Sequence, residues 1–254
     1  MEFTKNFDSK NYEYNVQSNI GIYIIHGFTS STFETKELAK YLSEKGYHTR
    51  TDNLPGHGTT VADCNTIKYR EWLEFAEQKF AEMLAENDKM FIIGISMGAV
   101  LGMHLATLFP ISGLVTAAPV FQFNDEKKLK WLNPWTKYFL PTLSKRGLYD
   151  KSVRNKLKFF GYNLYPMKAL AEFVKMTPII KTNINQITAP ILILYSENDA
   201  TSIKSNLDIV SNEISSESKT VLGYSNASHN LFANSVDKNK IFSDILKFIK
   251  INQI

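Results

Sequence analysis

Hydrophobic residues in this chain alternate between short β-branched bursts and longer stretches in which apolar positions recur every three or four residues. The bursts predict buried strands, and the longer stretches predict amphipathic helices. Strands are expected at 20–25, 46–51, 90–95, 113–117, 190–195 and 219–224. Helices are expected at 34–45, 70–86, 97–108 and 237–250. Because the two kinds of element alternate, we expect a mostly parallel central sheet with helices on both faces.

One segment, residues 124–183, breaks this alternation. It contains 13 Lys and Arg residues against 4 Asp and Glu residues, ten aromatic residues and no convincing sheet strand. We therefore expect a small helical insertion, or cap, over the sheet edge where ligands usually bind in α/β proteins. The two flanking parts, 1–123 and 184–254, would form one core domain.

Composition narrows the class of protein. The 254 residues are 44% hydrophobic, 13% aromatic and 21% charged, with a single cysteine, so a largely disordered chain and a disulfide scaffold are excluded. The net charge of +4 is the balance of +9 in the insertion and −5 elsewhere, and no nucleic-acid-binding motif accompanies it. The uncharged run 90–124 is interrupted by glycines, so we do not interpret it as a membrane span. No signal peptide is apparent. We therefore expect a cytoplasmic protein without a nucleic-acid partner.

The sharpest chemical signal is Gly94-Ile95-Ser96-Met97-Gly98, a G-x-S-x-G sequence between a predicted strand and a predicted helix. Small residues on either side let strand and helix approach through a tight, strained turn. That turn presents the serine at the helix N-terminus, where free N–H groups favour a developing anion. We interpret Ser96 as a nucleophile; the alternative is a Gly/Ser turn without chemistry.

A serine nucleophile needs a base, and the base needs an acid that fixes its tautomer. After a turn of this kind the acid comes next along the chain, and the histidine follows it. Three of the five histidines precede Ser96, and His104 lies in the same predicted helix. His229, in the polar loop between the last predicted strand and the last predicted helix, is therefore the candidate base. Taken alone, it would be interpreted as a surface loop residue.

The acid is expected at the end of the strand at 190–195. Asp199 is the preferred candidate there, whereas Glu197 is nearer the strand and Asp208 falls in a further predicted helix. Buried against the histidine, an ionised Asp199 would hold the imidazole with Nε2 facing the nucleophile.

Two N–H groups are expected to stabilise the oxyanion. One belongs to Met97, the residue after the nucleophile, and the other to Phe28, in the loop that follows the strand at 20–25. Gly27 would allow the turn between them. His57, in a Pro- and Gly-rich turn, is interpreted as a structural residue rather than a catalytic one.

Together these motifs resemble, in order and spacing, those of the α/β-hydrolases, and more narrowly the small bacterial carboxylesterases and monoacylglycerol lipases. The resemblance rests on HGFTSS (26–31), DNLPGHG (52–58), GISMGA (94–99), ENDA (197–200) and ASHN (227–230). It covers essentially the whole chain and is weakest in the insertion. It implies an α/β-hydrolase fold with a short cap, oxyanion donors at Phe28 and Met97, no cofactor or metal, and a catalytic triad formed by Ser96, Asp199 and His229.

The resulting hypothesis is a serine hydrolase that cleaves short to medium acyl esters, with monoacylglycerols among the candidates, through an acyl-enzyme. The alternatives are a thioesterase or amidase with the same triad, and a catalytically silent fold that binds a ligand. Relatives that prefer monoacylglycerols carry an acid shortly before a cap proline, where this chain has Asn163. The resemblance therefore counts against a preference for glycerol esters.

The cap offers candidate substrate-binding residues. A helix that starts at Pro166 would carry an apolar face at Met167, Leu170 and Val174, suited either to an acyl chain or to packing on the core. The basic and aromatic residues of the cap likewise have two interpretations, a solvated face and a transient contact with a membrane or lipid surface.

Overall fold

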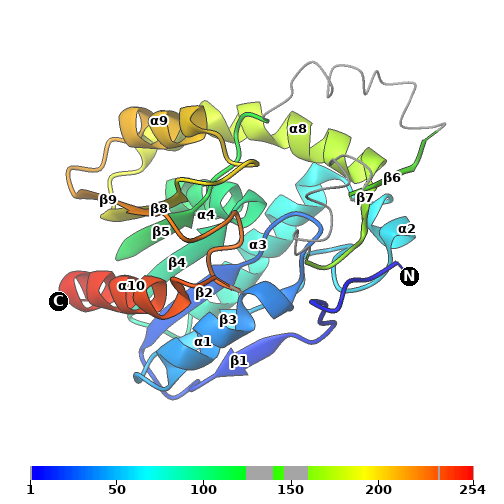
Figure 1. Cartoon of the computed structure of the whole chain (residues 1–254). Helices are drawn as coiled ribbons and strands as arrows, with labels where there is room; N and C mark the ends of the chain where they lie inside the picture. Colours follow the sequence, from blue (N-terminus) through cyan, green and yellow to red (C-terminus); the bar gives the residue numbers. More distant parts are fainter. Residues whose placement is uncertain (1, 124–139, 146–159, 234, 254) are drawn as a thin grey trace.

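The computed structural model describes residues 2–123, 140–145, 160–233 and 235–253 of the chain. At its centre lies a seven-stranded sheet with the order β1-β3-β2-β4-β5-β8-β9 (Figure 1). Its strands are β1 (Tyr12–Tyr14), β2 (Ile20–Ile25), β3 (His48–Thr51), β4 (Lys89–Ile95), β5 (Gly113–Ala117), β8 (Ile191–Ser196) and β9 (Lys219–Tyr224). Neighbouring strands are parallel, except that β1 runs antiparallel to β3. The predicted mostly parallel sheet is confirmed.

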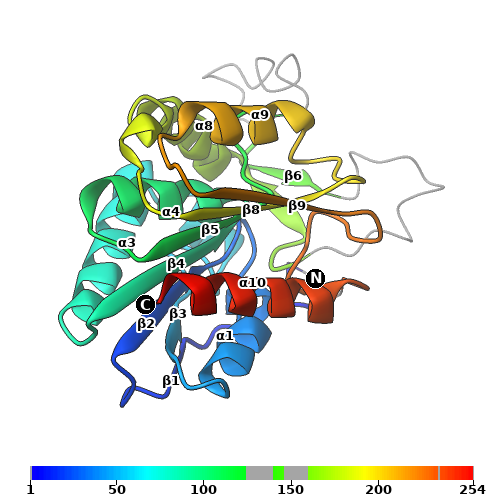
Figure 2. The same cartoon turned by 90° about the vertical axis from the view of Figure 1, so that its left-hand side faces the viewer.

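Helices cover both faces of this sheet (Figure 2). They are α1 (Lys36–Ser43), α2 (Val61–Cys64), α3 (Tyr69–Leu84), α4 (Met97–Leu108), α8 (Met167–Lys181), α9 (Lys204–Glu213) and α10 (Lys238–Asn252), with 3-10 turns η1 (Thr32–Glu34) and η3 (Ile184–Gln186). One apolar cluster joins α3, α4, α8 and α9 to one face of the sheet, and a second joins α1 and α10 to the other. No helix among the described residues is long and apolar enough to cross a membrane.

The six strands and four helices expected from the hydrophobic pattern are present, and their ends differ by at most two residues. The expectation that the insertion holds no strand is wrong. β6 (Thr142–Ser144) and β7 (Leu164–Pro166) pair there as a small antiparallel sheet. Each is three residues long, which is too short to produce a period-two pattern, so the pairing depends on contacts that the sequence pattern does not reveal.

The described part of the insertion lies between β5 and β8, and α8 begins directly after Pro166, as expected. Residues 124–139 and 146–159, which carry most of the basic side chains of the predicted cap, lie outside the described residues. The cap boundaries and the lipid-surface interpretation therefore stay predictions. One cap lysine, Lys145, is buried and does not belong to an exposed basic face.

The apolar face of α8 is turned relative to the predicted one. Met167 is buried, but Leu170 is only partly buried against the core and Val174 is 37% exposed. The helix packs through a set of residues shifted by about one position: Ala169, Phe173, Met176 and Ile180. The role of Met167, Leu170 and Val174 in substrate binding remains a prediction.

The strand register brings the predicted motifs to one edge of the sheet. Near the ends of the strands, Ile25 of β2 is paired with Gly94 of β4, and Ile95 of β4 with Ala117 of β5. β5 and β8 end side by side, as do β8 and β9. Because parallel strands end at the same edge, the loops that carry Phe28, Ser96, Asp199 and His229 all begin there.

Candidate active site

Ser96 occupies a strained turn between β4 and α4. Its φ and ψ angles are 56° and −117°, which places a residue with a side chain in the left-handed half of conformational space. Such a conformation costs on the order of 1–3 kcal/mol and persists where surrounding contacts impose it. The Ser96 N–H donates a 2.9 Å hydrogen bond to the Ala117 carbonyl, and the residue is 7% exposed. The turn therefore has the geometry that the G-x-S-x-G sequence predicts.

The two glycines of this motif are required by close backbone contacts. A β-carbon on Gly98 would lie 2.2 Å from the carbonyl oxygen of Ile25, at the end of β2. A β-carbon on Gly94 would lie 2.2 Å from the carbonyl oxygen of Gly98. Both distances are far below van der Waals contact, so only glycine lets α4 start this close to β2 and β4.

Asp199 and His229 meet across the loops that follow β8 and β9. The Nδ1–H of His229 donates a 2.7 Å hydrogen bond to Oδ2 of Asp199. A carboxylate accepts but does not donate, so Nδ1 carries the proton and Nε2 is left as the basic nitrogen. The other carboxylate oxygen accepts the N–H groups of Thr201 at 2.7 Å and Ser202 at 2.9 Å. The Asp199 side chain is 2% exposed, and these bonds hold it in one orientation.

Neighbouring charges control the protonation of His229. Burial favours the neutral imidazole and by itself would lower its pKa. The charge and hydrogen bond of Asp199, together with the charge of Glu34, outweigh burial and raise the pKa of His229 above its ordinary value. This environment stabilises the imidazolium that a general base becomes when it accepts a proton.

A second side chain, Ser196, ties the acid loop to the histidine loop. Its Oγ donates a 2.7 Å hydrogen bond to the Ala227 carbonyl and accepts the Asn198 N–H at 3.1 Å. The Ser196 hydroxyl therefore cross-links the two loops.

The loop after β2 folds into a turn in which the Ser30 N–H donates to the Gly27 carbonyl at 3.1 Å. Thr29, inside this turn, has a φ of 60°, which is unfavourable for a β-branched residue. Its N–H donates to Nε2 of His57 at 3.1 Å, and its carbonyl accepts the Tyr162 N–H at 2.9 Å. Contacts from two other segments thus hold the turn that carries Phe28.

The two predicted oxyanion donors belong to the two segments next to the nucleophile, the turn after β2 and the start of α4. Phe28 is the second residue of the turn after β2, and Met97 is the first residue of α4. Within the described part of the chain, no protein group accepts a hydrogen bond from either N–H. The Phe28 ring lies 5.5 Å from the ring of Phe173 and 6.1 Å from that of Trp72, measured between centroids. An aromatic wall therefore borders the predicted oxyanion site.

Burial keeps two further histidines near this loop neutral. Burial lowers the pKa of His26 to about 4 and the pKa of His57 well below its ordinary value. His26 Nδ1 contacts the Gly27 carbonyl at 2.8 Å, and its Nε2 accepts the Leu54 N–H at 3.1 Å. His57 Nδ1 contacts the Pro55 carbonyl at 3.2 Å, and its Nε2 accepts the Thr29 N–H at 3.1 Å. These contacts agree with the interpretation of His57 as a structural residue.

One described group of side chains has the composition of a metal site. Glu13, His48 and Glu86 place one possible ligand atom each within 4.8 Å of one another. Both ring nitrogens of His48 already have protein partners, Glu13 on Nε2 and Asn87 on Nδ1. The group lies at the β1–β3 side of the sheet, away from the loops described above. We therefore interpret it as a hydrogen-bonded structural cluster.

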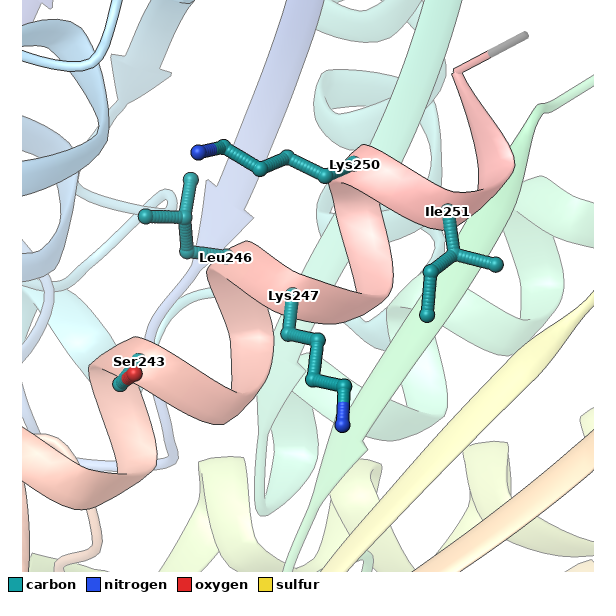
Figure 3. Close-up of a pocket in the computed structure, with 5 residues that line it drawn as sticks. All are labelled: Ser243, Leu246, Lys247, Lys250 and Ile251. Carbon is teal, nitrogen blue, oxygen red and sulfur yellow. The ribbon is translucent and has the colours of Figure 1, made fainter.

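A pocket also lies along α10, on the outer side of the molecule (Figure 3). It is lined by Ser243, Leu246, Lys247, Lys250 and Ile251. All five belong to one helix, and none of the predicted site residues is among them. This pocket has no part in the candidate active site.

The comparisons with known proteins agree with this geometry. Residues 18–235 match the Hydrolase_4 family, described as serine aminopeptidase, S33. The chain belongs to this family. A thermostable monoacylglycerol lipase of Bacillus sp. (strain H-257) is 26% identical over 216 residues, 83% of this chain and 82% of the lipase. A carboxylesterase of Bacillus subtilis (strain 168) is 21% identical over 233 residues, 90% of this chain and 92% of the esterase.

Solved structures support the fold of this Hydrolase_4 chain. A structure from work on LipS and LipT, two metagenome-derived lipolytic enzymes, has a TM-score of 0.85 and 24% identity, covering 96% of this chain and 98% of its own. The predicted α/β-hydrolase fold and the resemblance to bacterial carboxylesterases and monoacylglycerol lipases are confirmed. The relatives support a carboxylester hydrolase as the class of enzyme.

Sequence reasoning did not single out three residues of this region. Phe173 is one position away from the predicted apolar face of α8, so a small error in helix phase hid it. Tyr162 contacts the Phe28 loop directly after Gly161, which has a φ of 65°. In the sequence, the glycine is the local sign of this turn. Glu34 is one of many acids in the chain, and no pattern marks it as buried.

Proposed function

We propose that this chain is a serine esterase that hydrolyses carboxylic esters through Ser96, Asp199 and His229. The observation that carries the proposal is the 2.7 Å hydrogen bond between Asp199 and His229, two residues 30 positions apart in sequence. The strained Ser96 turn begins at the same edge of the sheet as the loops that carry this pair. A structural serine and a surface histidine would require neither feature.

In the proposed mechanism, Nε2 of His229 takes the Ser96 proton as the hydroxyl oxygen attacks the ester carbonyl. The N–H groups of Phe28 and Met97 stabilise the tetrahedral oxyanion, and their preorganised position is worth about 100- to 1000-fold in turnover for each donor. His229 then gives its proton to the leaving alcohol. Water repeats the sequence on the acyl-enzyme and releases the acid.

The acyl group is proposed to lie against the aromatic wall beside Phe28. Phe173 lies 5.2 Å from Phe123 as well as 5.5 Å from Phe28, so three rings from three segments adjoin. Apolar contact of this extent suits short to medium acyl chains. The monoacylglycerol lipase among the relatives supports a test with glycerol esters.

Asn163 is the residue that counts against a strong preference for glycerol esters. Its side-chain N–H donates to the Phe3 backbone carbonyl at 2.8 Å, and its backbone carbonyl accepts the Lys145 backbone N–H at 3.1 Å. It therefore ties the cap to the N-terminal segment. An acid at this position would supply a negative charge to hold glycerol hydroxyls, whereas Asn163 supplies none.

An amidase is the second candidate, because the family to which the chain belongs is described as a serine aminopeptidase. The same nucleophile, base and oxyanion donors serve esters and amides, so geometry alone favours neither. The relatives named as a lipase and a carboxylesterase favour esters.

A substrate panel tests this assignment. We expect kcat/KM to be highest for p-nitrophenyl esters of short to medium acyl length within a C2 to C16 series, with monoacylglycerols cleaved less efficiently. Acyl-CoA thioesters and amino-acid arylamides should be poorer by about 100-fold or more. Arylamides cleaved as fast as esters would overturn the esterase assignment in favour of the peptidase. No turnover in any arm would support a silent binding fold.

A further inference from the structure

Glu34 is a buried carboxylate beside the candidate active site that the mechanism above does not use. It ends η1, is 3% exposed, and accepts the Gly27 N–H at 2.8 Å through Oε2. Only Gly27 separates it from the nucleophile. A β-carbon on Gly27 would lie 3.2 Å from Cβ of Ser96 and 3.3 Å from Oε2 of Glu34. The Glu34 carboxylate thus adjoins both the Ser96 turn and the turn that carries Phe28.

Two basic side chains interact with this carboxylate through charge: His229, in the loop after β9, and Lys145, directly after β6. Lys145 is 4% exposed, and its Nζ donates to the Phe160 carbonyl at 3.2 Å. Burial lowers the pKa of Lys145 to about 7, against the opposing effect of Glu34. Glu34 and Lys145 are therefore both buried near the candidate base, whose own side chain is partly exposed.

The hydrogen bonds and charges around Glu34 favour its ionised form. Burial is the largest influence and holds the pKa of Glu34 above its ordinary value, while the Gly27 N–H and the charges of His229 and Lys145 offset part of this rise. The Gly27 N–H already points at an acceptor, which a protonated oxygen would serve less well. These three partners offset part of the free-energy cost of burying the charged carboxylate.

We propose that Glu34 is a positioning residue of the active site. It fixes the turn that carries the Phe28 oxyanion donor, and its negative charge stabilises the imidazolium form of His229. Asp199 holds the tautomer of His229 by direct contact, and Glu34 adds a second negative charge without touching the substrate. The inference rests on the proposed function, because it assigns Glu34 a role in a reaction at Ser96.

The substitution Glu34→Gln separates charge from hydrogen bonding. Glutamine keeps an oxygen that can accept the Gly27 N–H but removes the negative charge. We expect the acid limb of the kcat/KM profile against pH to move to lower pH, because the pKa of His229 falls. We also expect kcat to fall by about tenfold, because the imidazolium formed in the transition state loses stabilisation.

The matched control is Glu37→Gln, a neighbouring acid on α1 that is exposed and paired with Lys238. It removes the same charge outside the site, so its pH profile should coincide with that of the unsubstituted enzyme. NMR titration of the His229 ring gives the same shift independently of turnover. That readout tests the coupling even if the chain has no esterase activity and the proposed function fails.

The outcomes separate the alternatives. If Glu34 only holds the backbone, Glu34→Gln will fold, its acid limb and its His229 titration will match the control, and the proposal is overturned. If Glu34→Gln does not fold, Glu34→Asp serves instead: it keeps the charge but shortens the reach to Gly27. The proposal then requires an unchanged acid limb with kcat lowered about tenfold, and an unchanged kcat would contradict it.

Discussion

Replacement of Ser96 by alanine is expected to lower kcat for p-nitrophenyl esters by about a million-fold while leaving the fold intact. Alanine removes the hydroxyl that attacks the ester and makes no new contact in the turn. The backbone strain at φ 56° is similar for alanine and serine, so the melting temperature should change little. Steady-state kinetics and thermal unfolding of the purified variant provide the measurement.

Ser43→Ala is the matched control for this experiment. Ser43 lies at the end of α1, and its hydroxyl bonds only locally, to the Lys40 carbonyl at 2.8 Å. Its kinetics should equal those of the unsubstituted enzyme. If Ser96→Ala retained activity within tenfold of Ser43→Ala, Ser96 would not be the nucleophile.

Replacement of Asp199 by asparagine is expected to lower kcat by about ten-thousand-fold. The carboxylate accepts three N–H groups, from His229, Thr201 and Ser202. An asparagine can turn its amide N–H₂ toward the imidazole, which then presents Nδ1 as the acceptor and Nε2 with the proton. His229 would no longer be able to take the Ser96 proton.

The two acids that the sequence left open as alternatives are the controls. Glu197→Gln removes a charge in the loop after β8, and Asp208→Asn removes one in α9. The carboxylate that bonds to His229 is that of Asp199, not either of these. Each should retain kcat within about threefold of the unsubstituted enzyme. A loss of activity in Asp208→Asn or Glu197→Gln as large as in Asp199→Asn would show that the acid has been misassigned.

The sequence predicts the centre of the sheet well because β2, β4, β5 and β8 are buried on both faces and therefore read as nearly uninterrupted apolar runs. It also predicts the loops that carry Ser96, Asp199 and His229, because parallel strands end at one edge and the glycines of G-x-S-x-G mark the strained turn. The contact between Asp199 and His229 follows from chain order and this topology. None of these inferences needed information on side-chain packing.

The remaining features depend on contacts between segments that are distant in sequence. β6 and β7 are stabilised by pairing with each other and not by a local pattern; even the pair nearest in sequence, Ser144 and Leu164, has 19 residues between its members. The rotation of α8 about its own axis, which buries Phe173, is determined by its packing on α3 and α4. Glu34 is buried because the loop after β2 folds back on it, and no property of residues 30–36 alone reveals this.

Covalent labelling with a fluorophosphonate, followed by peptide mass spectrometry, tests the central claim most directly. The account predicts stoichiometric modification of the unsubstituted protein on Ser96 alone, with labelling absent in Ser96→Ala and slowed in Asp199→Asn. Modification of a different residue, or ester hydrolysis by a protein that takes up no label, would contradict it.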